Sequence, residues 1–124
     1  MKYAAILMFP FLVLIAGCDQ QAKHDSAMLD SILATRKIDT LEFISLAATN
    51  VVTGKKVQEI VAIINKTNRI TDTFLLKQHM QDVTFLDGTN RVCVLSLWGN
   101  GVWQFGAYDF RLQQGATISA FPRN

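Results

Sequence analysis

Apolar residues recur at helical spacing in two segments of the chain. The first lies around Met28 and Leu33 and predicts a short helix at about residues 26–36. The second runs from Val57 to Ile64 with apolar residues at i, i+3, i+4 and i+7, and it predicts the main amphipathic helix at about residues 54–67. Each predicted helix has one apolar face that has to be buried.

Patterns typical of β-strands fill most of the remaining chain. Residues 38–48 are rich in strand-forming types, although their alternation is imperfect. Beyond residue 81, apolar runs are separated by turn residues at 87–90, 99–101 and 113–115. These turns predict strands over residues 82–87, 91–98 and 102–106. Residues 108–112 either continue the last of these strands or form a fourth, and residues 116–121 are a candidate for a final strand.

The order of these elements indicates the fold class. Strands joined by short turns usually pair with each other in an antiparallel meander, and the sheet is the surface on which an amphipathic helix can bury its apolar face. We therefore expect a single small α+β domain over residues 26–124. In this two-layer fold, an antiparallel meander of about four to five strands packs on one main amphipathic helix, with a short N-terminal helix in addition.

The first seventeen residues differ from the rest of the chain. Lys2 supplies one positive charge, and an apolar run follows from Ala4 to Ala16 that only Pro10 interrupts. A helix over this run would rise about 20 Å, which is less than the roughly 30 Å of a hydrocarbon core. A charged start, a short apolar stretch and small residues at its end are typical of a secretory signal peptide.

The end of this segment carries a more specific motif before Cys18. Its four residues are Leu14, Ile15, Ala16 and Gly17. Together with Cys18 they resemble the lipobox of bacterial lipoproteins, a resemblance confined to residues 1–20. It implies that the signal peptide, residues 1–17, is removed and that Cys18 becomes an N-terminus carrying diacylglyceryl and further acyl groups such as palmitate. Two or three acyl chains anchor a protein stably, whereas a single chain binds marginally.

The same resemblance implies a location in the bacterial cell envelope, on a membrane and facing the periplasm or the exterior. Asp19 directly after the cysteine matches the pattern that retains lipoproteins at the inner membrane of enteric-type bacteria. The polar residues 18–25 are interpreted as the lipidated N-terminus and a tether between lipid and domain. The alternative is a cytosolic protein whose N-terminal helix is buried and ends in a free Cys18.

Composition and charge then exclude some partners. Half of the 124 residues are apolar and the net charge is +2, but the signal peptide holds the apolar excess. Basic residues occur only in pairs, such as 36–37 and 55–56, so no nucleic-acid partner is expected. With Cys18 lipidated, Cys93 is an unpaired thiol in an apolar strand. We interpret it as a small buried hydrophobe rather than as a nucleophile.

Catalytic and metal-binding motifs do not occur in the sequence. There is no Cys-x-x-Cys and no histidine pair at helical spacing, so we expect no metal and no cofactor. Asp82, Asp87 and Asp109 could be the paired carboxylates of a hydrolase, but turn and edge positions explain them more simply. An enzyme is accordingly the least favoured class.

Aromatic residues around the 99–101 turn are the most informative candidates for function. They either build the core or leave an exposed aromatic surface, which is a type of surface enriched in binding sites. The candidate partner contacts are Trp98, Trp103, Phe105 and Tyr108, together with His79 from the polar segment 77–82. We expect a membrane-anchored lipoprotein that binds a protein partner, as an inhibitor, an immunity or exclusion protein, or an accessory subunit. The alternative is a lipoprotein that binds a small molecule.

Overall fold

A computed structural model describes residues 20–72 and 74–113 of the chain. Over these residues it shows an α+β fold with two helices and an antiparallel open sheet of seven strands. The elements follow the chain in this order: α1 over 20–35, β1 Thr40–Ile44, β2 Thr49–Thr53, α2 Lys55–Ile63, the 3-10 turn η1 Lys66–Asn68, β3 Arg69–Ile70, β4 His79–Asp87, β5 Asn90–Trp98, β6 Val102–Phe105 and β7 Tyr108–Leu112.

The second half of the sheet confirms the predicted meander. Strands β4, β5, β6 and β7 are neighbours in the sheet in the order of the sequence. Asp87 pairs with Asn90 across the first of their turns. Gly88 in this turn has a φ of 61°, a conformation that glycine adopts without steric cost. The predicted strand at 116–121 lies outside the described residues.

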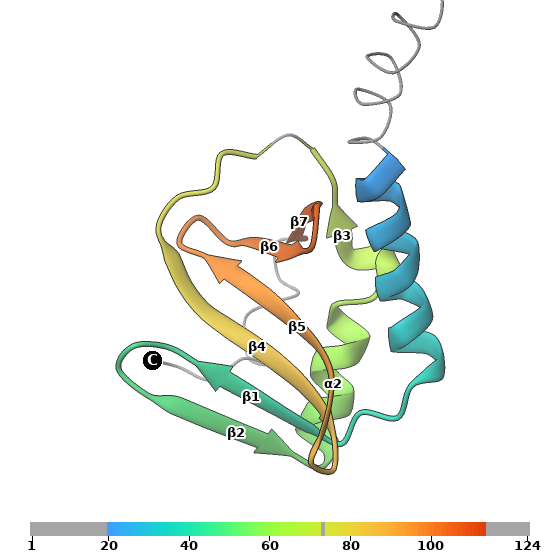
Figure 1. Cartoon of the computed structure of the whole chain (residues 1–124), viewed down its shortest axis with the longest axis vertical. Helices are drawn as coiled ribbons and strands as arrows, with labels where there is room; N and C mark the ends of the chain where they lie inside the picture. Colours follow the sequence, from blue (N-terminus) through green and yellow to red (C-terminus); the bar gives the residue numbers. More distant parts are fainter. Residues whose placement is uncertain (1–19, 73, 114–124) are drawn as a thin grey trace, which may run out of the picture.

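The first half of the sheet differs from the expectation. The segment predicted as one strand over 38–48 ends its pairing at Ile44 and turns back, with the amide of Ser45 donating to the carbonyl of Ala48. The chain then forms β2, an edge strand over residues that the sequence pattern does not predict as a separate strand. The sheet order is β2-β1-β4-β5-β6-β7-β3, so α2 and η1 carry the chain from one edge to the other (Figure 1). The prediction of four to five strands in a simple meander was therefore wrong.

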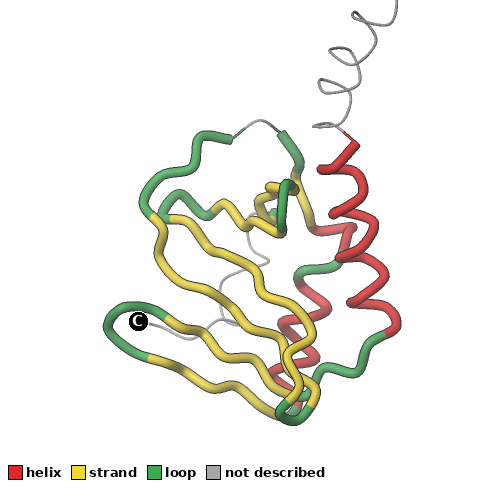
Figure 2. The backbone as a smooth tube through the Cα atoms, viewed as in Figure 1, coloured by secondary structure: helices red, strands yellow, loops and turns green. Residues whose placement is uncertain are grey.

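The two helices also differ from the predicted ones in length. Helix α1, drawn in blue to teal in Figure 1, covers 20–35 and packs on β6 and β7, so it is not a short accessory element. Helix α2 ends at Ile63, earlier than predicted, and begins after Gly54, whose φ is 69°. In Figure 2 both helices lie to one side of the strands.

The interpretation of residues 18–25 as a tether was wrong for residues 20–25, because these are helical. Asp25 is buried, and its Oδ2 accepts a hydrogen bond from the amide of Ala107 at 2.8 Å. A Cβ added at Gly106 would fall 2.5 Å from the same oxygen, so the turn between β6 and β7 closes tightly on the helix. This polar segment therefore has a specific partner in the sheet, which composition alone does not reveal.

A single apolar core lies between the sheet and the helices. Alternate residues of the strands point into it, as strand geometry requires. The core is built of these buried residues: Leu29, Ile38, Leu41, Phe43, Val57, Ile60, Ile64, Val83, Phe85, Cys93, Leu95, Trp103, Tyr108 and Phe110.

Arg69 places a charge inside this otherwise apolar region. Its side chain is 2% exposed, and Nη2 lies 2.7 Å from Oδ1 of Asp30 on α1. Its Nε donates to the carbonyl of Ile64 directly after α2, at 2.7 Å. The guanidinium also lies over the rings of Tyr108 and Phe110, at 5.8 and 5.3 Å from their centroids. One side chain thus joins both helices to the β3–β7 edge of the sheet.

The ion pair yields a stability prediction. Asp30→Leu is expected to lower the free energy of unfolding by about 3 kcal/mol, because it leaves the Arg69 cation buried without its counter-ion. In the double variant Asp30→Leu/Arg69→Met most of this loss should be recovered, since no charge remains buried. Urea unfolding followed by tryptophan fluorescence measures both values. Glu59→Ala, on an exposed position of α2, is the control and should change little. A double variant less stable than Asp30→Leu would contradict the interpretation.

Candidate functional site

The structure separates the predicted aromatic contacts onto two faces of the sheet. Trp103 and Tyr108 are 2% and 7% exposed and pack with Phe110 in the core, with ring centroids 6.4 and 5.2 Å from that of Phe110. Phe105, opposite Tyr108 in the register, is half-buried against the same core. The prediction that Trp103 and Tyr108 contact a partner was therefore wrong, because the strand register turns both toward the helices.

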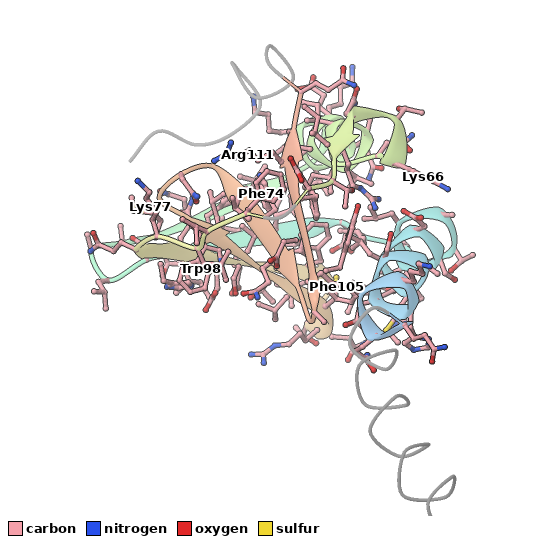
Figure 3. The ribbon with its side chains drawn as sticks, turned by 90° about the horizontal axis from the view of Figure 1, so that it is seen from above. Lys66, Phe74, Lys77, Trp98, Phe105 and Arg111 are labelled. Carbon is pink, nitrogen blue, oxygen red and sulfur yellow. The ribbon has the colours of Figure 1, made fainter. Side chains whose placement is uncertain are left out.

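Trp98 and His79 lie on the other face, which we call the outer face of the sheet. His79 pairs with Trp98 in the register of β4 and β5, and their rings meet edge to face with centroids 5.4 Å apart. Seen from above, Trp98 lies across the molecule from α1 (Figure 3). Part of the outer face is not accessible, because Val102 and Thr84 are buried there.

A row of polar side chains crosses the outer face. Asp82 of β4 pairs with Ser96 of β5, Ser96 with Gln104 of β6, and Gln104 with Asp109 of β7. The sequence pattern offered Asp82 as one of the paired carboxylates of a hydrolase, but it did not single out Ser96 or Gln104. Ser96 lies two residues from Trp98 on β5, and Gln104 lies two residues from Val102 on β6. Because alternate residues of a strand point to the same face, this spacing was the signal that could have found them.

Hydrogen bonds fix one corner of this row, which we call the His79–Trp98 corner: His79, Asp82, Ser96, Trp98 and Gln104. His79 Nε2 lies 2.8 Å from Asp82 Oδ1, and the Ser96 hydroxyl donates to the same oxygen at 3.1 Å. The Trp98 indole N–H donates to Gln104 Oε1 at 3.2 Å. The side chains of His79 and Asp82 are both 44% exposed. The corner is thus an ordered surface that a partner can reach.

Asp109 closes the row at its other end. Burial raises the pKa of its carboxyl, and a hydrogen bond from Gln104 acts in the opposite direction. Oδ1 of Asp109 is buried and has no hydrogen-bond partner among the described residues. The ionised form is therefore disfavoured in the folded protein relative to the unfolded chain, and Asp109 takes up a proton more readily than an exposed aspartate.

The geometry of the row does not resemble a hydrolytic site. Ser96 and His79 both meet Asp82, whereas activation of a serine requires the histidine between the serine and the carboxylate. Asp82 and Asp109 stand three strand spacings apart, about 14 Å, which exceeds the separation of paired glycosidase carboxylates. Over residues 20–72 and 74–113, no three potential metal ligands of the His, Cys, Asp and Glu types come together.

A groove between the helices is a second candidate. It has a volume of about 400 Å³, within the range of small-molecule sites. Its lining residues are Asp30, Leu33, Ala34, Val61, Ala62, Asn65, Lys66 and Arg69. The two groups at its charged end, Asp30 and Arg69, already form an ion pair with each other. Lys66 also lines the groove, and its side chain projects outward in Figure 3.

Comparison with known proteins found no matching family model, no matching curated protein and no matching solved structure. In the described part of the chain, no helix has the length and apolar character needed to cross a bilayer.

Cys93 provides a test of the buried core. It faces the helices opposite Phe85, and burial raises the pKa of its thiol to about 11, although Arg36 acts in the opposite direction. Since thiolate is the reactive form, a rise of two pKa units leaves about a hundredfold less of it at pH 8. Maleimide labelling of the native protein, followed by mass spectrometry, should be slower than labelling in urea by at least this factor. Equal rates would show that Cys93 is accessible.

Proposed function

We propose that this chain is an envelope lipoprotein, anchored through Cys18, that binds a protein partner through the His79–Trp98 corner. The observation that carries the binding proposal is Trp98, a partly exposed indole whose N–H is already bonded to Gln104. Tryptophan is among the residue types enriched at the energetic centres of protein interfaces. A partner that covers the ring need not supply an acceptor for the indole N–H.

The surroundings of Trp98 support a pre-organised contact. His79 packs edge-on against its ring, and Asp82 holds His79 at 2.8 Å. The His79 imidazole beside the indole and the Asp82 carboxylate bonded to it favour a complementary polar partner surface. Since the three side chains are fixed on β4 and β5, little side-chain entropy is lost when a partner binds.

Anchoring and binding reinforce each other in this proposal. A lipid on Cys18 confines the domain to the membrane, which raises its effective concentration toward membrane or periplasmic partners. This suits an inhibitor, an immunity or exclusion protein, or an accessory subunit, each of which acts by occupying a partner. No step of this function requires a metal, a cofactor or a nucleophile.

The anchor is tested by metabolic labelling. Cells expressing the full chain should incorporate radioactive palmitate into it, and the processed protein should sediment with membranes. Cys18→Ala should abolish both the label and the processing, because it removes the thiol that accepts the diacylglyceryl group. Cys93→Ala, the matched control, should retain the label. Palmitate in the Cys18→Ala protein would contradict the anchor.

The binding surface is tested by one substitution. The partner is first identified by cross-linking and co-purification of the full lipidated chain from detergent-solubilised membranes. Trp98→Ala is then expected to weaken the complex by about 2 kcal/mol, roughly thirtyfold in Kd. Val51→Ala, an exposed apolar residue on the edge strand β2, is the control and should bind as the wild type.

Near-UV circular dichroism shows whether the Trp98→Ala domain remains folded. A folded Trp98→Ala protein that binds as tightly as the Val51→Ala protein would contradict this surface.

The groove between α1 and α2 favours a second candidate, a lipoprotein that binds a small molecule. Ala62→Trp would fill this groove from an exposed position on its wall. Loss of ligand binding in this variant, with no effect of Trp98→Ala on any partner, would favour the second candidate over the first.

A further inference from the structure

We infer that the domain sits directly on the bilayer, with the start of α1 and residues 74–78 in contact with lipid headgroups. This inference rests on the proposed lipidation of Cys18 and goes beyond it, because an anchor alone does not orient a domain. The features that orient it are the short distance from Cys18 to α1, the attachment of α1 to the sheet, and the exposed side chains at this end of the molecule.

The first feature is the absence of room for a flexible linker. Asp19 alone separates Cys18 from residue 20, where the described part of α1 begins. Two residues span at most about 7 Å, and the five helical residues from there to Asp25 rise about 8 Å. The lipidated residue is therefore within about 15 Å of a side chain that is hydrogen-bonded to the sheet.

The second feature is the attachment of α1 along its length. Asp25 accepts the amide of Ala107, Leu29 is fully buried in the core, and Asp30 forms the ion pair with Arg69. Asp25 lies one turn before Leu29 and Asp30, so the contacts hold two successive turns of the helix. A helix fixed in this way transmits the position of its first turn to the whole domain.

The third feature is the segment between β3 and β4, which arches over the end of the molecule at which α1 begins (Figure 1). Leu75 and Leu76 in this segment are 83% and 38% exposed, and Lys77 follows them. Two hydrogen bonds hold the backbone here in place. Asn100 Nδ2 donates to the carbonyl of Leu75 at 2.6 Å, and the Gly99 amide donates to the carbonyl of Gln78 at 2.7 Å. The two leucines are thus displayed on a fixed support.

The support has a further attachment on the outer face. The Arg111 guanidinium lies over the ring of Phe74, with 4.9 Å between its Cζ and the ring centroid. The two residues adjoin in the view from above (Figure 3). In this view Lys77 lies across the molecule from α1. Contact with a surface at two separated places, the α1 start and residues 74–78, restricts the tilt of the domain.

The chemistry of this end fits a lipid surface. The first exposed positions of α1 are polar or basic, Gln20, Gln21, Lys23 and His24, as expected for residues at headgroup depth. Apolar side chains beside a lysine are typical of segments that enter the interface while the ammonium group stays near the phosphates. Leu46, the most exposed leucine among the described residues, lies in the turn between β1 and β2, and this turn is away from this end (Figure 1). If exposure of an apolar side chain alone decided which part meets the bilayer, Leu46 would be the contact. The proposed orientation places residues 74–78 there instead.

The orientation has a consequence for the proposed binding site. His79 begins β4 directly after residues 74–78, so the His79–Trp98 corner lies beside the bilayer surface. The partner is then met at the membrane rather than in free solution.

The experiment uses the full lipidated chain in vesicles of phosphatidylcholine and phosphatidylglycerol. A fluorescent maleimide is attached to a single introduced cysteine, Leu75→Cys, Leu46→Cys or Thr89→Cys, the last in the turn between β4 and β5. The wild-type chain, whose remaining thiol is the buried Cys93, is the labelling blank. Nitroxide lipids quench fluorophores at the bilayer, and aqueous iodide quenches those in solution.

The expected result is loss of most of the fluorescence at residue 75 with nitroxide lipids, with residues 46 and 89 quenched mainly by iodide. If nitroxide lipids quench residue 75 no more than residue 89 in a lipidated chain, the proposed contact of the domain with the bilayer is overturned, while the lipid anchor on Cys18 is not. Stronger nitroxide quenching at residue 46 than at residue 75 overturns it in favour of contact through the β1–β2 turn. A chain that carries no palmitate overturns the proposed lipoprotein function and the seating together.

Discussion

The arrangement of this domain depends on the buried guanidinium of Arg69. It pairs with Asp30 of α1, donates to the carbonyl that follows α2, and lies over two aromatic rings of β7. A buried charge is costly unless its partners are well placed, so the two helices and the sheet edge can satisfy it in few relative positions. The helices then cover one face of the sheet, and the polar row across β4 to β7 lies on the other.

This division of faces explains why one aromatic residue is proposed for binding and its neighbours are not. Trp98 and Trp103 stand on adjacent strands, yet Trp103 completes the core and Trp98 lies among polar side chains. The side on which each falls follows from the register of β5 against β6. The same register brings Gln104 beneath the indole N–H of Trp98.

Local signals in the sequence were sufficient for part of this structure. The turns at 87–90 and 99–101 predicted the succession of β4, β5 and β6 correctly, because turn chemistry and alternation act over a few residues. The separation of β6 from β7 at Gly106 was left open by the sequence pattern. Strand β3 has two residues and is held by its pairing to β7, so no local pattern marks it. The polar start of α1 has the composition of a tether, and the contact that makes it part of the domain, between Asp25 and Ala107, joins residues 82 positions apart. The ion pair between Asp30 and Arg69 likewise joins residues that only the tertiary structure brings together.

The central claim is that α1 belongs to the rigid domain from its first turns, so that little slack separates the domain from Cys18. Native-state hydrogen exchange of the full chain, read by mass spectrometry on peptides, measures this most directly. The amides of residues 24–30 are expected to exchange slowly, in the range of those of β4 and β5. Exchange of these amides at the rate of an unstructured peptide, while β4 and β5 stay protected, would contradict it.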